Sequence, residues 1–341
     1  MGSLFLFLSL SFIIIFIIHA IFLGINLIFW STNGLQVLLL KMNFIETIYY
    51  SIYLKWILLI DVLWLSGLLI FMLKRKHYKT DPELHYLRYD PIEEPKICVI
   101  IPTYNEEENV KNVVTDYINQ KNIESVIVID NNSSDNTVQI AKQCGAITIT
   151  KKVNKGFADS CVIGLFESLK TNANIIAFTE CDGTFSAYDL EKMIPYLNNS
   201  HIVIGTRQVQ VLTEKGNQNS MFYVWGNYLL AKLIQIKYFS LLHLGIVQLT
   251  DVGCMHRCIR RDALEKIIDQ FTYPGTKEVK ITANSGLFAI FMTIIGIENN
   301  LKIVEIPVTF KKRIGVSKTK SDKKIRALRY GFTFLWYILR H

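Results

Sequence analysis

Acidic and amide side chains recur directly after short apolar runs in the middle of the chain. One run is followed by Pro102-Thr-Tyr-Asn-Glu106, and the next by Asp130-Asn-Asn-Ser-Ser-Asp135. Later runs are followed by Glu180-Cys-Asp182-Gly-Thr184 and by Gly205-Thr-Arg207. These segments combine carboxylates, amides and one arginine, and that combination suits the binding of a phosphorylated ligand together with a metal ion.

Each kind of group has a chemical task at such a site. Carboxylates and amides hydrogen-bond the base and ribose of a nucleotide. Glu180 and Asp182 form a carboxylate pair that can hold Mg²⁺ or Mn²⁺ through oxygen. A cation there would neutralise a diphosphate and stabilise it as a leaving group. Arg207 can grip a phosphate with two parallel donors. The pattern therefore favours a nucleotide-sugar donor.

The alternative interpretation is that these residues form ordinary turns and helix caps. It fits Asp135 and Asn136, because both directly precede a segment with a helical pattern. It fits the whole set poorly, since polar groups follow four separate apolar runs in the same way.

The apolar runs are short, rich in β-branched residues and bounded by polar segments, so they predict buried strands. The predicted strands are residues 97–101, 126–129, 146–150, 175–179 and 202–204, with helical stretches at residues 107–119, 136–143 and 156–169. Strands that alternate with helices predict an α/β domain with a mostly parallel sheet. Ligands bind at the carboxyl ends of strands in such sheets, which is where the polar segments lie.

The first part of the chain differs from the rest in charge. The chain has 341 residues and a formal net charge of +8, but residues 1–73 hold only four charged side chains, which cancel. Residues 4–30 and 56–73 predict two transmembrane helices, since a span needs about 20 apolar residues. Lys-Arg-Lys follows at 74–76, and basic residues beside a span mark the cytosolic side. We therefore predict a membrane anchor whose N-terminus and following domain both lie in the cytosol.

Two details of the anchor bear on this prediction. No basic residue precedes the first apolar run and no small-residue cleavage site follows it, so a retained anchor is favoured over a signal peptide. Asp61 lies within the second predicted span. We interpret it as a shallow residue near the interface, although intramembrane acids are often functional.

Two later segments predict helices that lie in the membrane interface. Residues 221–247 mix aromatic and aliphatic side chains with Lys232 and Lys237, whose ammonium groups would snorkel to water. Residues 325–339 carry aromatic side chains between arginines, and their apolar core is too short to span. The alternative is that both helices bury against the domain. We favour membrane contact, most strongly for the C-terminal helix.

Six cysteines lie in the part predicted to be cytosolic, so we expect free thiols there. The segment Cys254-Met-His256-Arg-Cys258 contains metal-ligand residue types. It lacks a second ligand pair at zinc-finger spacing, so a zinc site is disfavoured.

Taken in order, the motifs of this chain resemble glycosyltransferase family 2, whose members have a GT-A fold, a Rossmann-like domain with a mostly parallel sheet. The motifs that carry the resemblance are Pro102-Thr-Tyr-Asn-Glu106, Asp130-Asn-Asn-Ser-Ser-Asp135, Asn154-Lys-Gly156, Glu180-Cys-Asp182, Gly205-Thr-Arg207, Thr250-Asp251-Val-Gly and a closing motif over residues 305–318. The likeness covers residues 96–320. Within the family it is greatest to dolichyl-phosphate mannose or glucose synthases and related archaeal polyprenyl-phosphate enzymes.

The resemblance implies a role for each motif. The nucleotide pocket would be lined by Pro102, Tyr104, Glu106, Asp130, Asn131 and Thr184. Glu180 and Asp182 would bind Mg²⁺ or Mn²⁺ beside the donor. Arg207 would contact the donor phosphates or the incoming acceptor phosphate. Arg313 and Lys318 would do similar work from the C-terminal side.

Two positions depart from the family pattern. Glu180 stands where the family usually has aspartate, so its carboxylate lies one methylene further from the backbone. It can reach the metal through water, or bind the sugar or ribose instead. Asn131 replaces a common aspartate, and this leaves selection between uracil and guanine open.

The resemblance also implies the acceptor, a polyprenyl or dolichyl phosphate that receives a hexose from a GDP-mannose or UDP-glucose type of donor with inversion. A lipid phosphate is anionic at pH 7, its second pKa being about 6, so it needs no general base. Holding two phosphates together needs cations instead, and Arg207, Lys215, Arg313 and Lys318 suit that task. Asp251 would position the acceptor, act as a base for a hydroxyl acceptor, or form a structural turn.

Other classes of protein fit the same residues less well. A processive polysaccharide synthase would carry a Gln-x-x-Arg-Trp motif and later spans, and neither is visible. A glycolipid synthase that acts on a lipid hydroxyl would need Asp251 as base. If Glu180 prevented metal binding, the chain would be a non-catalytic membrane protein that binds nucleotide sugars. The presence of Asp182, Arg207, Arg313 and Lys318 argues against this alternative. No basic motif interleaved with aromatic residues supports nucleic-acid binding.

The predicted organisation is a membrane anchor at residues 1–73, a proline-containing linker at 74–95, a GT-A domain at 96–320 and an amphipathic juxtamembrane helix at 321–341. The expected partners are a nucleotide diphosphate sugar, a polyprenyl phosphate and the membrane, with a homo-oligomer left open. The expected location is the plasma membrane of a prokaryote or the endoplasmic reticulum of a eukaryote.

Overall fold

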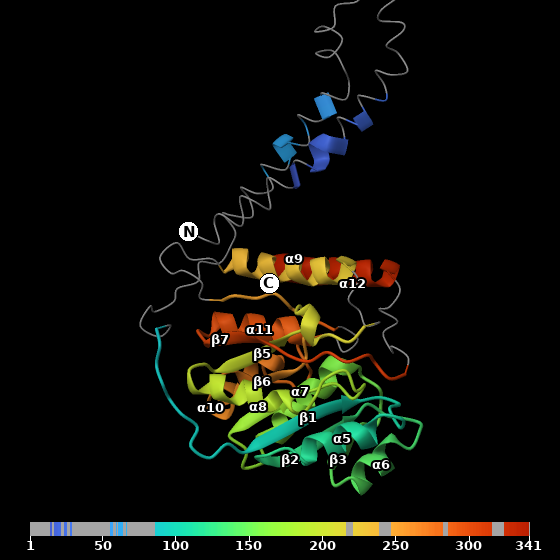
Figure 1. Cartoon of the computed structure of the whole chain (residues 1–341), viewed down its shortest axis with the longest axis vertical. Coiled ribbons are helices and arrows are strands. Elements are labelled where there is room, and N and C mark those ends of the chain that lie inside the picture. The colour runs from blue at the N-terminus through green and yellow to red at the C-terminus, as the bar shows by residue number, and fades with distance from the viewer. Residues whose placement is uncertain are drawn as a thin grey trace, which may run out of the picture. The chain divides into compact units, whose positions relative to one another are not determined.

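A computed structural model of the protein describes residues 86–215, 221–238, 247–281, 286–315 and 324–340, together with short helical pieces within residues 14–28 and 55–66 (Figure 1). The chain divides into two compact units. One comprises Met1–Tyr78 and Ile236–Gly245, and the other comprises Lys79–Gln235 and Ile246–His341. The second unit contains the predicted α/β domain.

The centre of the second unit is a seven-stranded sheet with the order β3-β2-β1-β4-β6-β5-β7. Its strands are β1 (Ile97–Thr103), β2 (Ile123–Asp130), β3 (Ile147–Thr150), β4 (Ile175–Phe178), β5 (Ile202–Thr206), β6 (Arg257–Arg260) and β7 (Ile303–Pro307). Only β6 runs antiparallel to its neighbours among these strands. The predicted α/β class with a mostly parallel sheet is confirmed.

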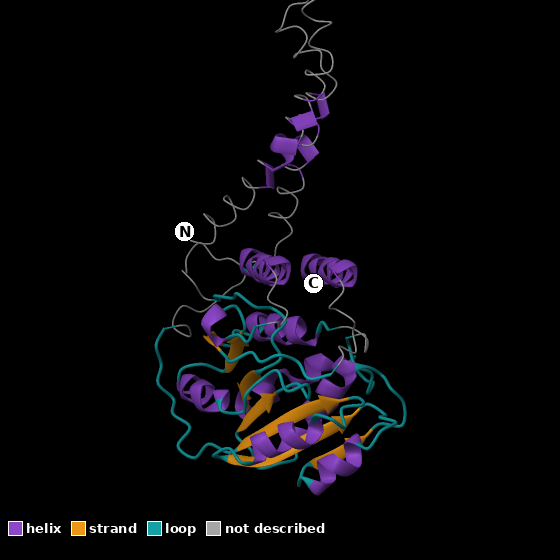
Figure 2. Ribbon diagram, turned by 45° about the vertical axis from the view of Figure 1, so that its right-hand side comes forward, coloured by secondary structure: helices purple, strands orange, loops and turns teal. Residues whose placement is uncertain are grey.

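Helices cover the sheet. Figure 2 shows the strands in one layer, with helices packed against it. The helices of this unit are α5 (Val110–Ile118), α6 (Thr137–Gln143), α7 (Phe157–Ser168), α8 (Asp189–Met193), α9 (Met221–Lys237), α10 (Arg261–Ile267), α11 (Phe288–Glu298) and α12 (Lys324–Arg340). Short 3₁₀ helices lie at Ile194–Asn198, Gln210–Leu212 and Ile268–Phe271. Every side chain of β1 is buried, as expected for a central strand covered on both faces.

The antiparallel strand β6 is anchored by a buried arginine. Arg257 donates to the carbonyl oxygens of Cys254 and Ala289 and to the Thr293 hydroxyl, so it ties the strand to α11. Burial lowers the pKa of Arg257 to about 10. These hydrogen bonds supply the partners that a buried guanidinium requires.

The cysteines near β6 have no metal-like arrangement. Cys254 and Cys258 are buried free thiols, as are most of the six. His256 stacks on Phe185, with ring centroids 5.2 Å apart, and burial lowers its pKa to about 4. This part of the chain therefore packs as core, in line with the expectation of free thiols.

The predicted linker is partly attached to the domain. The backbone N–H of Asp90 donates to Asn198 at 2.8 Å, and the Asp90 carboxylate pairs with Arg260 at 2.9 Å. The N–H of Ile92 donates to the Asn198 side chain. Residues 86–95 therefore lie along the domain surface, while residues 74–85 fall outside the described part of the chain.

The two predicted interfacial segments contain the helices α9 and α12. The lysines of α9 are less exposed than the sequence predicts. Lys232 and Lys237 are buried, and the Lys232 ammonium lies over the Tyr228 ring with Gln235 as its acceptor. Lys232 therefore finds its partners within α9 and not in water, contrary to the prediction that it snorkels.

The C-terminal helix α12 presents an exposed apolar stripe. The exposed large apolar side chains on it are Ile325, Leu328, Phe332, Trp336 and Leu339. Their spacing of three or four residues places them on one face of the helix. Ile338 faces inward and is fully buried, and Tyr337 contacts the Phe291 ring of α11 at 6.2 Å between centroids.

The N-terminal unit is described only in short helical pieces, so the two predicted spans lie mostly outside the described residues. Within what is described, none of the helices combines the length and the apolar character that a membrane crossing requires. The Asp61 carboxylate lies 3.0 Å from His19 Nε2, which links the two predicted spans by a polar contact.

Candidate functional site

The polar segments meet at one edge of the sheet, as the strand directions require. Thr103 of β1 is in register with Asp130 of β2, so the segments that follow these strands lie side by side. Because β6 runs antiparallel to both β4 and β5, these two strands run in the same direction. Their carboxyl ends therefore lie at the same edge, and this edge collects the predicted site residues.

The segments after β1 and β2 are joined by hydrogen bonds. The N–H of Asn105 donates to Ser133 Oγ, and the N–H of Glu106 donates to Thr137 Oγ1, each at 2.8 Å. The fully buried Asp130 accepts the Ser133 N–H with both carboxylate oxygens. This interlocked pair of loops forms one wall of the candidate site.

The predicted nucleotide-pocket residues differ in how available they are. Pro102 is buried within β1, next to Ile129 of β2. Tyr104 keeps 37% of its surface exposed, which leaves its ring available to a ligand. The Glu106 carboxylate accepts a hydrogen bond from Asn109 Nδ2 at 2.8 Å.

Both polar atoms of the Asn131 side chain form hydrogen bonds within the protein. Its Nδ2 donates to Asn154 Oδ1 at 2.7 Å, and its Oδ1 accepts the N–H of Lys155 at 3.1 Å. The Asn154 oxygen also accepts the N–H of Gly156. Asn131 therefore braces the loop that precedes α7, and this favours a structural role over direct recognition of a base.

The second wall of the site holds the two carboxylates predicted to bind metal. Thr184 donates to Asp182 Oδ1 from its N–H at 3.1 Å and from its hydroxyl at 2.6 Å. Gly183 between them has a φ of 73°, a left-handed conformation that glycine adopts without strain. The sequence Asp-Gly-Thr thus fixes Asp182 by a tight local turn.

Arg313 reaches this carboxylate pair from the C-terminal side. Its Nη2 lies 2.5 Å from Asp182 Oδ2 and 3.5 Å from Glu180 Oε2. The N–H of Ile314 donates to the Asp182 carbonyl, and that of Lys311 donates to the Thr184 carbonyl. The segment after β7 is therefore held against the Asp182 turn, as its predicted role requires.

Glu180 is unusual in its ionisation. Burial and the neighbouring Asp182 carboxylate raise the pKa of Glu180 to about 8, although Arg313 opposes them. Two acids this close share the stabilising charge of Arg313, with a smaller contribution from Arg207. The pair therefore lacks cationic charge, which a divalent ion would supply.

The Glu180 and Asp182 carboxylates suit a divalent ion whose remaining ligands come from the substrate and from water. Among the described residues, no group of three or more His, Cys, Asp or Glu side chains is arranged to hold a metal. Mg²⁺ sites for nucleotides commonly use one or two carboxylates and complete the shell with phosphate oxygens and water. The buried Asp182 Oδ2 lies 2.5 Å from Arg313 Nη2, so a cation already occupies the position where such an ion would bind this oxygen.

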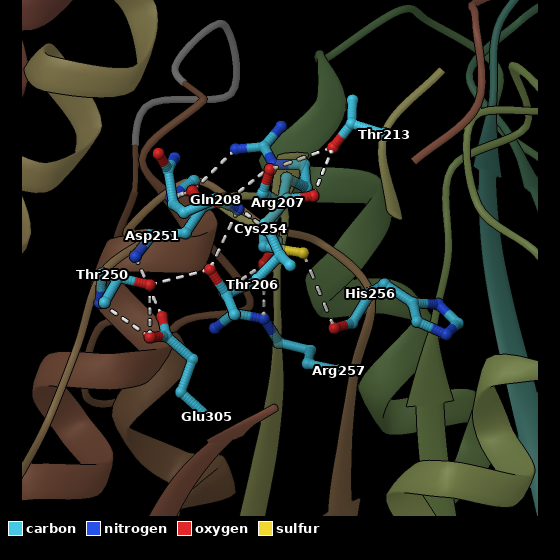
Figure 3. Close-up of polar contacts among 12 residues, drawn as sticks. Thr206, Arg207, Gln208, Thr213, Thr250, Asp251, Cys254, His256, Arg257 and Glu305 are labelled. Carbon is cyan, nitrogen blue, oxygen red and sulfur yellow. Dashed lines mark hydrogen bonds and ion pairs between the residues drawn. The ribbon is translucent and has the colours of Figure 1, made fainter. Parts of the chain in front are cut away.

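A second arginine–carboxylate pair lies at the end of β5 (Figure 3). Arg207 Nε and Nη2 donate to the two oxygens of Asp251 at 2.6 and 2.7 Å. Burial opposes ionisation of Asp251, but Arg207 outweighs it, so the pKa of Asp251 lies below its ordinary value. Asp251 is therefore a weak base that holds Arg207 in place.

Phe310 lies between the two pairs. The Arg207 guanidinium lies over its ring at 5.3 Å, and Phe185, next to Thr184, contacts it at 5.7 Å between centroids. Arg207 also lowers the pKa of Glu180 through space. The two arginine–carboxylate pairs therefore form one continuous candidate site.

The structure brings together nearly all the predicted site residues that it describes. Lys318 falls outside the described residues, and Lys215 is exposed at the end of a described segment. The sequence did not single out Thr250 and Glu305, which the structure places in contact with the Asp251 loop, although both lie in the motifs quoted above. The available signal was an acid, Glu305, within an otherwise apolar strand.

Comparison with known proteins identifies the family of the chain. A sequence model of the family described as Glycosyl transferase family 2 matches residues 98–268. The chain therefore belongs to glycosyltransferase family 2, and it is a glycosyltransferase.

Several similar proteins have informative names. A polyprenol monophosphomannose synthase of Mycolicibacterium smegmatis is 26% identical over 232 residues, which cover 65% of this chain and 80% of that protein. An undecaprenyl-phosphate mannosyltransferase of Micrococcus luteus is 23% identical over 258 residues, covering 72% and 98%. A UDP-N-acetylglucosamine–dolichyl-phosphate N-acetylglucosaminyltransferase of Methanococcus voltae is 32% identical over 130 residues, covering 33% of this chain and only 51% of that protein.

Solved structures with similarity to the chain include glucosyl-3-phosphoglycerate synthase from Mycobacterium tuberculosis in complex with Mn²⁺, UDP-glucose and phosphoglyceric acid. The sequence identity is 16%, the TM-score is 0.49, and the match covers 72% of this chain and 80% of that one.

Proposed function

We propose that this glycosyltransferase has a GT-A fold and moves a hexose from a nucleotide diphosphate sugar to a polyprenyl phosphate, with inversion at the anomeric carbon. The observation that carries the proposal is the pair of arginine–carboxylate clusters at one edge of the sheet, Arg313 with Glu180 and Asp182, and Arg207 with Asp251. Such a site suits a reaction in which a donor diphosphate and an acceptor phosphate must lie close together. The names of three similar proteins specify polyprenol-type acceptors.

The donor would lie against the first cluster. Glu180 and Asp182 would hold Mg²⁺ or Mn²⁺, with Thr184 fixing the orientation of Asp182. When bound, the ion supplies positive charge that stabilises the departing diphosphate. Arg313 would then be free to exchange its carboxylate partners for a phosphate oxygen. Tyr104 and Glu106 lie on the opposite wall, where the nucleoside would bind.

The acceptor phosphate would lie near Arg207. Asp251 occupies the Nε–H and one Nη2–H of this arginine, and an arginine has five N–H donors. The remaining three N–H groups are not committed to Asp251 and suit a phosphate. An oxygen of the lipid phosphate attacks the anomeric carbon, the bond from that carbon to the diphosphate breaks, and the nucleoside diphosphate leaves.

This arrangement favours an anionic acceptor over a hydroxyl. A hydroxyl acceptor needs a general base near neutral pKa. Asp251, the candidate base, has a depressed pKa and uses both oxygens to hold Arg207. A phosphate acceptor needs no such base, so the geometry supports the polyprenyl phosphate.

The lipid acceptor requires a membrane location for the site. We propose that residues 1–73 anchor the protein, that residues 74–95 link the anchor to the catalytic domain at 96–320, and that the helix within 321–341 contacts the cytosolic membrane face. Support comes from the exposed apolar stripe of α12, which Arg329 and Arg340 accompany as exposed cations. This face would belong to the plasma membrane in a prokaryote or to the endoplasmic reticulum in a eukaryote.

A donor screen tests the proposal. The full-length protein in lipid nanodiscs is incubated with Mn²⁺, polyprenyl phosphate and one radiolabelled donor at a time, namely GDP-mannose, UDP-glucose or UDP-N-acetylglucosamine. We expect a labelled lipid that releases its sugar in mild acid and has the mass of a polyprenyl-phosphate hexose for GDP-mannose or UDP-glucose. An acid-stable glycoside, or no labelled lipid with any donor, would contradict the proposal.

A further inference from the structure

Glu305 of β7 accepts three hydrogen bonds from one short loop (Figure 3). Its Oε2 accepts from the Thr250 N–H and hydroxyl, each at 2.7 Å, and its Oε1 accepts the Asp251 N–H at 2.9 Å. These backbone groups lie outside the strands and helices, so they lack regular partners. Glu305 therefore fixes the loop that carries Asp251.

The same loop is attached to β5, the strand that ends at Arg207. Thr250 Oγ1 lies 2.7 Å from Thr206 Oγ1, and the Arg207 N–H donates to Asp251 Oδ2 at 3.2 Å. Glu305 itself is in the strand beside β5, in register with Ile204. The loop is thus held from two adjacent strands at once.

The space around the Arg207 guanidinium is closely filled on the loop side. A Cβ added at Gly253 would lie 3.2 Å from Arg207 Nη2, closer than most Cβ contacts. The N–H of Gly253 also donates to Asp251 Oδ1. A small shift of this loop would therefore move the guanidinium, because the loop both orients and confines it.

We propose that Glu305 is a positioning residue for sugar transfer: it holds the Thr250–Asp251 loop so that Asp251 presents the Arg207 guanidinium to the phosphate groups of the substrates. This inference rests on the proposed function, in which Arg207 binds phosphate. Glu305 itself touches no reacting atom. Its effect passes through Asp251.

The charges around Glu305 make this role dependent on pH. Burial raises the pKa of Glu305 to about 7, the Thr250 hydroxyl opposes that rise, and the Asp251 carboxylate adds to it. From α9, the buried Lys232 ammonium attracts Glu305 through space. Below about pH 7, Glu305 takes up a proton, and its O–H then faces backbone donors that need an acceptor. The loop loses a hydrogen bond as the pH falls.

The experiment is the pH profile of transfer to polyprenyl phosphate in Glu305→Gln, measured with the full-length protein. We expect kcat/KM at pH 8 to fall about 10- to 100-fold, the scale for a slightly misplaced group at an active site. With Mn²⁺ at a concentration that keeps Glu180 ionised, we also expect the acid limb of the wild-type profile near pH 7 to disappear. Glu265→Gln is the matched control, because Glu265 is exposed and pairs with Arg261 on α10. A Glu305→Gln variant with the wild-type rate and limb would overturn the proposal.

Two substitutions of Thr250 keep the test decisive if Glu305→Gln fails to fold. Thr250→Val removes the hydroxyl that favours ionised Glu305, so the acid limb should move to higher pH. Thr250→Ser keeps the hydroxyl and should restore the wild-type limb. An unmoved limb in Thr250→Val would count against the proposal.

A binding measurement distinguishes failure of this inference from failure of the proposed function. If the wild type transfers no sugar to polyprenyl phosphate, the affinity for inorganic sulfate, a phosphate-like anion that does not titrate in this range, is measured against pH by calorimetry as a probe of Arg207. Under the inference, this affinity weakens below pH 7 in the wild type but not in Glu305→Gln. Equal pH dependence in the two proteins, or no binding by either, would reject the inference.

Discussion

Two arginines at the same edge of the sheet have different surroundings. Arg207 makes a bidentate pair with the fully buried Asp251 and keeps 16% of its side chain exposed. Arg313 makes one close contact with Asp182 and a longer one with Glu180, and 30% of its side chain is exposed. Sequence reasoning gave both the same task. Under the proposed function, Arg207 would be a fixed phosphate ligand, whereas Arg313 would exchange between carboxylates and phosphate.

The largest expected effect comes from the carboxylates that Arg313 shares. Asp182→Ala removes the buried carboxylate of this cluster, and we expect transfer to fall about 1,000-fold, the upper end for loss of one strong electrostatic contact. Steady-state transfer with each donor measures it. Asp262→Ala is the control, since Asp262 is an exposed acid that pairs with Arg260. Unchanged turnover in Asp182→Ala would remove the metal-site assignment.

The stability of the protein should separate the two clusters. Asp251→Asn leaves Arg207 without its buried anionic partner, and we expect a loss of about 3 kcal/mol in the free energy of unfolding. Arg313→Ala breaks a more exposed pair and should cost about 1 kcal/mol or less. Denaturant titration of both variants measures the difference. Equal losses would mean that the two pairs are equally fixed.

The buried His256 sets part of the response to acid. His256 follows the Asp251 loop and stacks on Phe185, next to the Asp182 turn. Burial lowers its pKa to about 4, while an unfolded histidine titrates at about 6.5. The unfolded state therefore binds the proton more readily, and the stability that His256 contributes above pH 6.5 is lost as the pH falls toward 4.

The test of this point compares the wild type with His256→Gln. We expect the free energy of unfolding to depend less steeply on pH between 6.5 and 4 in the variant. The result also separates acid unfolding from the loss of activity near pH 7 assigned to Glu305. Identical slopes would show that His256 is not kept neutral in the folded protein.

The smallest effect tests the exchange of Arg313 directly. Arg313→Ala frees Asp182 and Glu180 from a competing cation, so Mn²⁺ alone should bind about fivefold more tightly, equivalent to about 1 kcal/mol. Calorimetry without any nucleotide measures this affinity. The same variant should bind a nucleotide diphosphate sugar less tightly. Weaker binding of Mn²⁺ alone would contradict the idea that Arg313 occupies the place of the ion.

Local patterns in the sequence predicted one part of this molecule well. The strands β1 to β5 were expected close to where they lie, because each is a short apolar run that ends in a polar segment. Parallel strands place such segments at one edge, so the grouping of Asp130, Asp182 and Arg207 followed from their positions alone.

The parts that were missed depend on contacts between distant segments. β6 begins with the buried charge of Arg257, and a charged strand gives no apolar run to detect. The role of Glu305 arises only when β7 pairs with β5 and meets the Thr250 loop. The snorkelling predicted for Lys232 failed because Tyr228 and Gln235, on the same helix, give it buried partners.

We propose that an anionic lipid phosphate, held by a fixed Arg207, accepts the sugar without a general base. The most direct measurement offers the full-length protein equal amounts of a polyprenyl phosphate and the matching free polyprenol, with the donor that gives the highest rate. We predict labelled product on the phosphate alone, and a sugar that mild acid releases. Transfer to the free polyprenol at a comparable rate would contradict the account, because a hydroxyl acceptor requires a base that Asp251 cannot supply while it holds Arg207.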